Sequence, residues 1–304
     1  MSPREIEFVQ YDAFTRTRLS GNQCAVLFCN GDGGVPSDAT MLRVTREFNH
    51  SETAFVIAPS RGGDIAARYW TPGGEIPLAG HPTLCTVAAC VERGLVQEGP
   101  LRLELPAGVV DVEAVRDDAG VVSITMEQLD GEFGTILDDR ALVADVIGLQ
   151  EDDLLPDVPV QCVTTGAWHI MCAVRDRALL DKCDFDQGKV RQLRAKYPDV
   201  EFFCLHVFHV GTADDGSVST MARGFAELPD PLEDPFTGSA TGCMGVFCRK
   251  YNLLGSATSF TAEQGVQMGR PGMASVAFSA TTQRVRVTGP AVPVVKGTIF
   301  VDDA

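Results

Sequence analysis

Residues 75–90 read EIPLAGHPTLCTVAAC, and residues 233–248 read EDPFTGSATGCMGVFC. The Glu, the first Pro, the Gly, the Thr and both Cys recur 158 residues apart, as Gly238 is from Gly80. In each stretch a turn that contains Pro and Gly precedes a segment that looks helical. A pattern that recurs at this distance predicts two similar domains, each contributing one helix of this kind.

The two expected helices carry no charge over most of their length. Residues 82–91 and residues 240–247 contain no Asp, Glu, Lys or Arg. A helix that is apolar on every side is buried on every side, and small side chains suit a helix inside a curled sheet. We therefore predict an α+β fold of two similar domains, each a curled β-sheet or barrel around a central buried helix. We expect one domain at residues 1–127, completed by residues 287–304, and the other at residues 128–286.

Three further segments are expected to be helical, and one of them runs from about Gln187 to Tyr197. Residues 38–48 carry an apolar stripe, with Ser37 or Asp38 as the N-cap and Asn49 as a residue that can end the helix. The Asp-rich residues 138–156 are expected to contain a helix and to link the two halves. Most other segments alternate like strands.

The starts of the two repeated helices predict a binding site. The first turn of a helix has N–H groups without intrahelical partners, and the helix dipole places positive potential there. Each start is therefore a site for an anion. With His81 on one start and Asp234 beside the other, we expect a shared cleft for a small carboxylate between the domains.

The composition narrows the classes of partner. The 304 residues include 25 basic and 41 acidic side chains, for a net charge of −16. This charge argues against nucleic acid and anionic membranes as partners, because no basic stripe offsets it. The N-terminal residues are polar, and no apolar run is long enough to cross a membrane. Ten cysteines without a signal peptide are typical of reduced thiols, so we expect a cytoplasmic protein.

With these residues identified, the chain resembles the phenazine-biosynthesis (PhzF-like) isomerase family, which has the diaminopimelate epimerase-like fold. The resemblance extends from about Ile6 to Val301. The matching motifs are Asn49-His-Ser51-Glu52-Thr53-Ala-Phe, Tyr69-Trp-Thr71-Pro72, Gly80-His81-Pro82-Thr83, Asp234-Pro235-Phe-Thr237-Gly238-Ser239-Ala240, Gln264-Gly265 and Met268-Gly-Arg270-Pro271. Their order and spacing together are fairly specific.

The resemblance implies a role for each motif residue. It implies that Glu52 is the general acid/base and that His81 and Asp234 bind and polarise the substrate. The substrate-binding residues that it implies are Ser51, Gly80, Gly238 and Ser239. The chemistry is reasonable, because a partly desolvated carboxylate can take a proton from one carbon and return it to another.

Each candidate also has a structural alternative. His81 could serve as a structural hydrogen-bonding residue, and Asp234 could cap the helix that follows. We assign Glu75 a structural role and leave the role of Glu233 open. Ser239 lacks the second Gly of a nucleophile elbow, so we do not expect it to be a nucleophile.

One departure separates this chain from racemases and epimerases of the same fold. Those enzymes use two thiols, one beside each helix start, and the corresponding residues here are Ala79 and Thr237. Neither residue can act as a thiolate base. Cys85 and Cys243 lie more than one helical turn further along, and we expect them to be structural.

We therefore predict a cofactor-independent isomerase that moves a proton within a small carboxylic acid, cyclic or unsaturated. This is the chemistry of a trans-2,3-dihydro-3-hydroxyanthranilate isomerase. The alternatives are an epimerase or lyase on the same fold, and a small-acid binding protein without activity. The sequence predicts no metal site and no cofactor, and it leaves a homodimer open.

Overall fold

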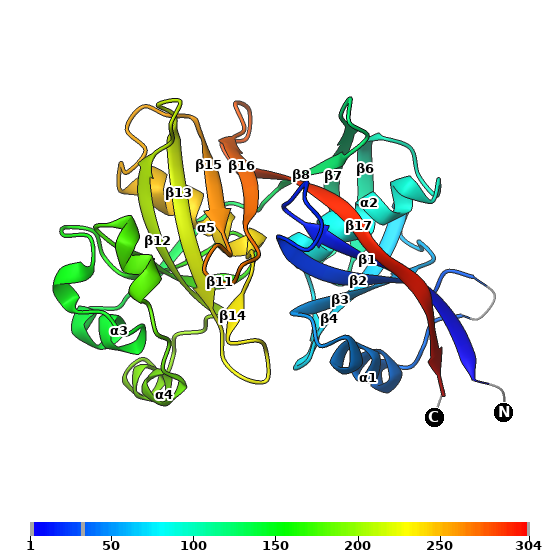
Figure 1. Ribbon diagram of the computed structural model, residues 1–304, viewed down its shortest axis with the longest axis horizontal. Coiled ribbons are helices and arrows are strands. Elements are labelled where there is room, and N and C mark those ends of the chain that lie inside the picture. Colours follow the sequence, from blue (N-terminus) through cyan, green and yellow to red (C-terminus); the bar gives the residue numbers. More distant parts are fainter. Residues whose placement is uncertain (1–2, 32–33, 303–304) are drawn as a thin grey trace. The chain divides into compact units, whose positions relative to one another are not determined.

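The computed structural model describes residues 3–31 and 34–302, and the chain divides into two compact units (Figure 1). Unit 1 consists of Met1–Glu127, Pro229–Pro231 and Thr288–Ala304, and unit 2 consists of Gln128–Leu228 and Leu232–Val287. Within the described ranges, no helix is both long enough and apolar enough to cross a membrane.

Unit 1 is built mainly of strands. Its helices are α1 (Asp38–Phe48) and α2 (Gly80–Glu92). Its strands are β1 (Arg4–Ala13), β2 (Asn22–Phe28), β3 (Glu52–Ile57), β4 (Ile65–Thr71), β5 (Gly74–Ile76), β6 (Gly99–Leu105), β7 (Gly108–Arg116), β8 (Val122–Glu127) and, from Thr288 onward, β17 (Val285–Val301).

The sheet of unit 1 is mixed and closes on itself. β1 pairs antiparallel with β2, β2 parallel with β3, and β3 antiparallel with β4. β4 then pairs parallel with β6, which leads through antiparallel pairs to β7 and β8. β17 pairs with both β8 and β1 and so completes the ring.

Helix α2 lies inside this ring. It packs against β1, β2, β3, β4 and β8, and every residue from His81 to Val91 is buried. The absence of charge along α2 explains this position, because each side of the helix meets the inner face of the sheet.

Helix α1 packs on the outside of unit 1 and positions the strand that follows it. The Ser37 hydroxyl accepts a hydrogen bond from the Thr40 N–H at 3.2 Å, which caps the helix start. Asn49 ends the helix in the left-handed conformation, with φ at 52°. The predicted helix and both of its end signals are confirmed. The chain then turns directly into β3, whose first residue is Glu52.

Unit 2 contains the remaining elements. Its helices are α3 (Arg140–Val146), α4 (Gln187–Lys196), α5 (Gly238–Lys250) and the short 3₁₀ helices η1 (Glu151–Asp153) and η2 (Arg177–Lys182). Its strands are β9 (Glu132–Ile136), β10 (Gln161–Thr164), β11 (Trp168–Ala173), β12 (Cys204–Thr212), β13 (Val218–Phe225), β14 (Glu233–Asp234), β15 (Ser259–Gln264), β16 (Gly272–Phe278) and the first residues of β17.

The strands of unit 2 follow the same order of directions as those of unit 1. β11 runs parallel to β12, β12 antiparallel to β13, β13 parallel to β15, and β15 antiparallel to β16. Helix α5 packs against β10, β11 and β16, as α2 packs against its own sheet. The duplication seen in the sequence is therefore present in the strand pairing as well.

The Asp-rich residues 138–156 differ from the expectation that they link the halves. They belong to unit 2, where α3 buries Val143, Ala144 and Val146 in an apolar core together with residues of β11, β12 and α4. Although the segment is rich in acidic residues, α3 also carries an apolar stripe. The burial of that stripe holds the segment within unit 2.

Candidate active site

Glu52 is a buried carboxyl group at the start of a central strand. β3 lies between β2 and β4, and Glu52 is paired in register with Cys24 of β2. The side chain is only 6% exposed, although glutamate is normally a surface residue. Burial of a carboxyl group is costly unless it has polar neighbours, so its surroundings are informative.

His81 is the polar neighbour of Glu52. It is the second residue of α2 and is 3% exposed, and its Nδ1 lies 3.2 Å from Glu52 Oε2. A proton between these two atoms is held either by the imidazole, which then donates to the carboxylate, or by the carboxyl group, which then donates to the imidazole. The fold thus brings together two predicted site residues that are 29 positions apart in the sequence.

Asn22 connects Ser51 to the same group. This asparagine begins β2 and is fully buried. Its Oδ1 accepts a hydrogen bond from the Ser51 hydroxyl at 3.2 Å, and its Nδ2 lies 3.2 Å from His81 Nδ1. In unit 1, the predicted residues Ser51, Glu52 and His81 therefore form one polar cluster at the start of α2, whose first residue is Gly80.

In unit 2, Asp234 lies just before the start of the central helix α5. It is 8% exposed and lies on β14, paired with Gly224 of β13. The Thr237 hydroxyl donates to Asp234 Oδ2 at 2.7 Å, and Gln264 Nε2 donates to the Asp234 carbonyl at 2.7 Å. The Thr237 N–H donates in turn to Gln264 Oε1 at 3.1 Å. These bonds fix the chain just before α5.

Gly238 and Ser239 are the first two residues of α5. The Gly238 carbonyl accepts a hydrogen bond from Gln128 Nε2 at 3.0 Å. The Ser239 hydroxyl lies 3.0 Å from Nε2 of His169, a fully buried residue of β11. In unit 2, Asp234, Gly238 and Ser239 therefore gather at the start of α5.

The two helix starts are alike in their capping. The N-cap residues are Ala79 for α2 and Thr237 for α5, and within the described chain neither side chain accepts a hydrogen bond from its helix. Neither helix has an acidic residue in its first turn. Neither start is therefore neutralised by an N-cap side chain or by an acidic residue of its own first turn.

Cys85 and Cys243, the repeated cysteines of the two central helices, are not equipped to act as bases. All ten cysteines are buried and free, and both Cys85 and Cys243 are inaccessible to solvent. Burial raises the pKa of the Cys243 thiol to about 12, and it raises that of Cys85 as well. A thiol that stays protonated at neutral pH is not a proton acceptor.

The residues that the sequence did not identify are Asn22 and His169, whereas Gln264 lies in the Gln264-Gly265 motif but was assigned no role. All three are polar side chains that are at most 1% exposed. Two of them begin otherwise apolar strands, Asn22 on β2 and His169 near the start of β11. A polar residue at the edge of an apolar run is a weak sequence signal, and its importance shows only when the fold buries it.

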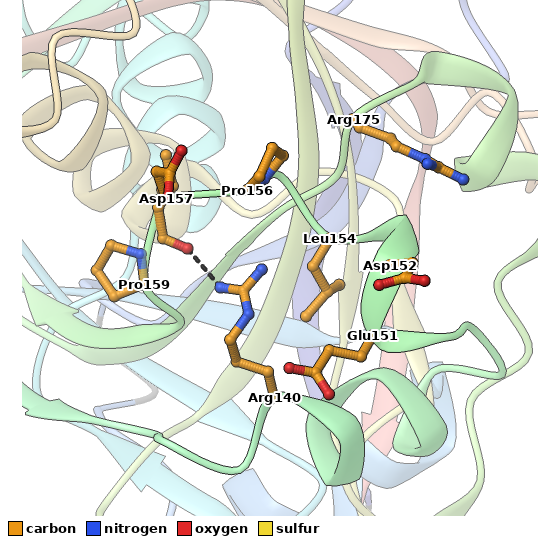
Figure 2. A pocket seen from close by; sticks show the side chains of 9 residues that line it. Arg140, Glu151, Asp152, Leu154, Pro156, Asp157, Pro159 and Arg175 are labelled. Carbon is orange, nitrogen blue, oxygen red and sulfur yellow. Dashed lines mark hydrogen bonds between the residues drawn. The ribbon is translucent and has the colours of Figure 1, made fainter.

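A large hollow of unit 2 lies away from all the predicted site residues. Figure 2 shows this cavity of about 640 Å³, which is lined by residues around α3 and η1 such as Arg140 and Glu151. Arg140 donates to the Val158 carbonyl at 2.5 Å and to the Leu155 carbonyl at 3.0 Å. Its guanidinium group is thus used to hold the wall of the cavity. Across the described residues, no group of three or more His, Cys, Asp and Glu could hold a metal ion.

Comparisons with known proteins find similarity over nearly the whole chain. The family model described as "Phenazine biosynthesis-like protein" matches residues 11–297. An uncharacterized isomerase of Bacillus subtilis, YfhB, is 29% identical, with 95% of this chain and 97% of that protein covered. The trans-2,3-dihydro-3-hydroxyanthranilate isomerase of Pseudomonas fluorescens is 27% identical, with 96% and 98% covered.

A solved structure is similar over the same length. The crystal structure of a phenazine biosynthesis protein of the PhzF family from Bacillus anthracis superimposes with a TM-score of 0.84. It is 26% identical in sequence, and 98% of this chain and 100% of that chain are covered. The mixed sheets with few helices described above are thus the fold of that protein.

Proposed function

The chain belongs to the phenazine biosynthesis-like protein family, and we propose that it is an isomerase that moves one proton within a small carboxylic acid. Relatives named trans-2,3-dihydro-3-hydroxyanthranilate isomerase suggest the substrate class, a cyclic and unsaturated acid. The observation that supports the proposal most strongly is the contact between Glu52 and His81, both buried and 3.2 Å apart.

Glu52 performs the proton transfer in this proposal. Its carboxylate takes a proton from a carbon of the substrate, and the electron pair of the broken C–H bond enters the conjugated system. The resulting carboxylic acid returns the proton to another carbon. The product has the same atoms and oxidation level as the substrate, so the reaction as written requires no external electron donor or acceptor.

His81 keeps both protonation states of Glu52 satisfied. When Glu52 is ionised, an N–H at His81 Nδ1 can donate to it, and when Glu52 is protonated, its O–H can donate to Nδ1. Asn22 Nδ2 lies 3.2 Å from the same nitrogen and can donate to it only while Nδ1 carries no proton. Because Glu52 is 6% exposed, bulk water has little access to the proton while it is carried.

The starts of the two central helices supply the anion sites in this proposal. Backbone N–H groups near Gly80 and Gly238, with the Ser239 hydroxyl, would bind substrate carboxylate and hydroxyl oxygens. Asp234 would orient a polar substituent of the substrate, while Thr237 holds the carboxylate. The assignment of both helix starts to one ligand stays a prediction.

Isotope transfer tests the proposal. The protein is incubated with trans-2,3-dihydro-3-hydroxyanthranilate in heavy water, and the product is examined by NMR and mass spectrometry. We expect a product that is an isomer of the substrate, in which solvent deuterium enters part of the molecules at the carbon that accepts the proton. Starting material deuterated at the carbon that loses the proton should transfer part of its label, because one base serves both carbons.

Three other results would change the assignment. Exchange at a single carbon with inversion would indicate an epimerase, and release of a small fragment would indicate a lyase. Tight binding without exchange or turnover, across a panel of cyclic and unsaturated acids, would indicate a binding protein and overturn the proposal.

A further inference from the structure

His169 is a buried histidine to which no sequence motif assigned a role. It is 0% exposed and comes from β11, beside the start of α5. Its Nε2 lies 3.0 Å from the Ser239 hydroxyl oxygen. The ring of Phe203 packs edge-on against the imidazole, with centroids 6.0 Å apart and planes at 87°. The imidazole is therefore held in one place and points at a residue of the candidate site.

We propose that His169 is a positioning residue that donates its Nε2–H to Ser239, so that the Ser239 hydroxyl proton points away from it and donates to an anionic ligand. The inference rests on the proposed function, in which Ser239 binds substrate oxygen. It goes further by assigning the direction of the hydrogen bond.

The surroundings of the other ring nitrogen decide the tautomer. His169 Nδ1 is buried, and within the described residues it has no hydrogen-bond partner. A buried N–H group without an acceptor is rarer in proteins than a buried acceptor without a donor. The favoured neutral ring therefore carries its proton on Nε2 and leaves Nδ1 bare. Nε2–H then donates to the Ser239 oxygen, which lies 3.0 Å away.

The protonation state of the ring agrees with this geometry. Burial lowers the pKa of His169 to about 3, and the neighbouring His206 contributes to the shift. The ring is therefore neutral near pH 7. The neutral Nε2–H of His169 can orient the Ser239 hydroxyl without placing a charge in the core. An unpaired charge there would be costly.

The other unit contains the same arrangement at the same place in the repeat. His81 and Ser239, 158 positions apart, are each the second residue of a central helix. Each is contacted by a fully buried polar side chain from the start of a neighbouring strand, His81 by Asn22 and Ser239 by His169. The polar contact to this helix position is thus kept in both units with different residue types, which favours a role in presenting the helix residue.

Nitrogen NMR of the histidine ring tests the tautomer without any substrate. Protein labelled with ¹⁵N-histidine is recorded between pH 8 and pH 5, and the His169 signals are assigned by their loss in His169→Gln. We expect a protonated Nε2, an unprotonated Nδ1 and no titration over this range. A proton on Nδ1, or a ring that titrates near pH 6.5, would overturn the proposal. This result stands even if the isomerase activity is not found.

Kinetics then test the effect on Ser239. With trans-2,3-dihydro-3-hydroxyanthranilate as the probe, His169→Leu removes the donor and should raise KM roughly tenfold, the size of one hydrogen bond, with kcat little changed. His169→Gln keeps an N–H donor and should restore most of the affinity. In a Ser239→Ala background, His169→Leu should have no further effect on KM.

His206→Leu is the matched control for these variants. His206 is as buried as His169, but within the described residues neither of its ring nitrogens has a hydrogen-bond partner, so its replacement should leave KM unchanged. An equal change in KM for the two Leu variants, or additive effects of His169→Leu and Ser239→Ala, would show that His169 only supports the core. A loss of folded protein would lower the maximal rate but would not raise KM.

Discussion

Glu52 and His81 are buried together, and in the proposed mechanism this contact would let a glutamate carry a proton in the core of unit 1. A carboxyl group that meets only apolar atoms would stay protonated and could not act as a base. The imidazole at 3.2 Å offers a hydrogen-bonding atom to either form of the carboxyl group. The pair is therefore suited to a carboxyl group that changes its protonation state during turnover.

Glu52→Gln should remove the proton transfer and keep the fold. The amide is nearly isosteric with the carboxyl group, so the free energy of unfolding should change by less than about 1 kcal/mol. The loss of a positioned acid/base should lower kcat by about 100-fold to 10,000-fold. Steady-state kinetics and urea unfolding measure the two effects. Turnover within tenfold of the unmodified protein would exclude Glu52 from the mechanism.

His206 should make the protein sensitive to acid. Burial lowers the pKa of His206 to about 3, whereas the unfolded chain has the ordinary histidine value of 6.5. Between these values the unfolded state binds a proton that the folded state does not. The free energy of unfolding therefore falls as the pH falls, by about 1.4 kcal/mol per pH unit for one such histidine.

His206→Leu should reduce this sensitivity. Both ring nitrogens of His206 are buried without a hydrogen-bond partner in the part of the chain that the structure describes. An apolar side chain of similar size should therefore be tolerated near pH 7.5 within about 1 kcal/mol. Urea unfolding at several pH values from 7.5 to 4 checks the slope. Curves for the variant and the unmodified protein that run parallel would show that His206 does not titrate as described.

The paired elements β4–β5 and β13–β14 show why the repeat keeps its glutamates. Arg68 of β4 binds Glu75 of β5 through two nitrogens, at 2.6 and 2.7 Å. Arg223 of β13 binds Glu233 of β14 in the same way, at 2.8 and 2.7 Å. Bidentate pairs of this kind fix geometry. Each glutamate therefore joins the short strand before a central helix, β5 or β14, to its neighbour, β4 or β13. This gives Glu233 a structural role like that of Glu75.

The central helices also share an internal bond. The Thr83 hydroxyl donates to the Ala79 carbonyl at 2.8 Å, and the Thr241 hydroxyl donates to the Thr237 carbonyl at 3.0 Å. The repeated Thr thus uses its side chain within its own helix, as threonines inside helices often do. This leaves the residue two positions earlier, His81 or Ser239, as the polar group at each helix start.

Helix α5 should tolerate alanine at Gly245 better than at Gly242. A Cβ at Gly242 would lie 1.8 Å from Gln128 Oε1, and this side chain is held by bonds to Gly238 and Thr165. A Cβ at Gly245 would meet only valine and phenylalanine side chains, at 3.2 Å or more.

Alanine adds the same helix propensity at both positions, so the comparison isolates the contact with Gln128. We expect Gly242→Ala to be less stable than Gly245→Ala by about 2 kcal/mol, the cost of displaced buried hydrogen bonds. Thermal and urea unfolding of the two variants measure the difference. Equal stabilities would show that Gln128 moves aside at little cost.

For the molecule as a whole, the sequence predicts that one ligand engages both central helices. Glu52→Gln protein with trans-2,3-dihydro-3-hydroxyanthranilate should bind without turnover. Hydrogen exchange followed by mass spectrometry should then slow at the starts of α2 and α5, because bound oxygens occupy their first-turn N–H groups. Protection at only one helix start would contradict the shared cleft. Ser239→Ala with the same ligand provides a control for the α5 contribution.

The parts of the fold that follow local rules were predictable from the sequence. Helix α1 begins after Ser37 and ends at Asn49 as expected, because its caps are coded in neighbouring residues. The absence of charge in α2 likewise predicted its burial. Residues 138–156 were misplaced because their acidic side chains are local, whereas the burial of α3 depends on strands elsewhere in unit 2.

For the candidate site too, residues within local motifs were predictable from the sequence, and residues brought in by strand pairing were not. Glu52, His81, Asp234 and Ser239 lie in motifs that the resemblance identified. The partners of Asp234, Thr237 and Gln264, lie in these motifs too, but Asn22 and His169 do not. Asn22 and His169 are isolated in sequence and become important only because strand pairing buries them beside a helix start. Their roles depend on distances between segments, which no local pattern contains.

The long last strand ties the two ends of the chain into one sheet. β17 lies between β1 and β8, so β1 is synthesised long before β17, the strand with which it pairs. During synthesis the ring of unit 1 has two open edges, which are sites for incorrect pairing with other chains. Closing the ring also joins residues almost a full chain length apart, which slows folding. Unit 2 lies between these two strands in the chain, so its synthesis is complete before unit 1 can close.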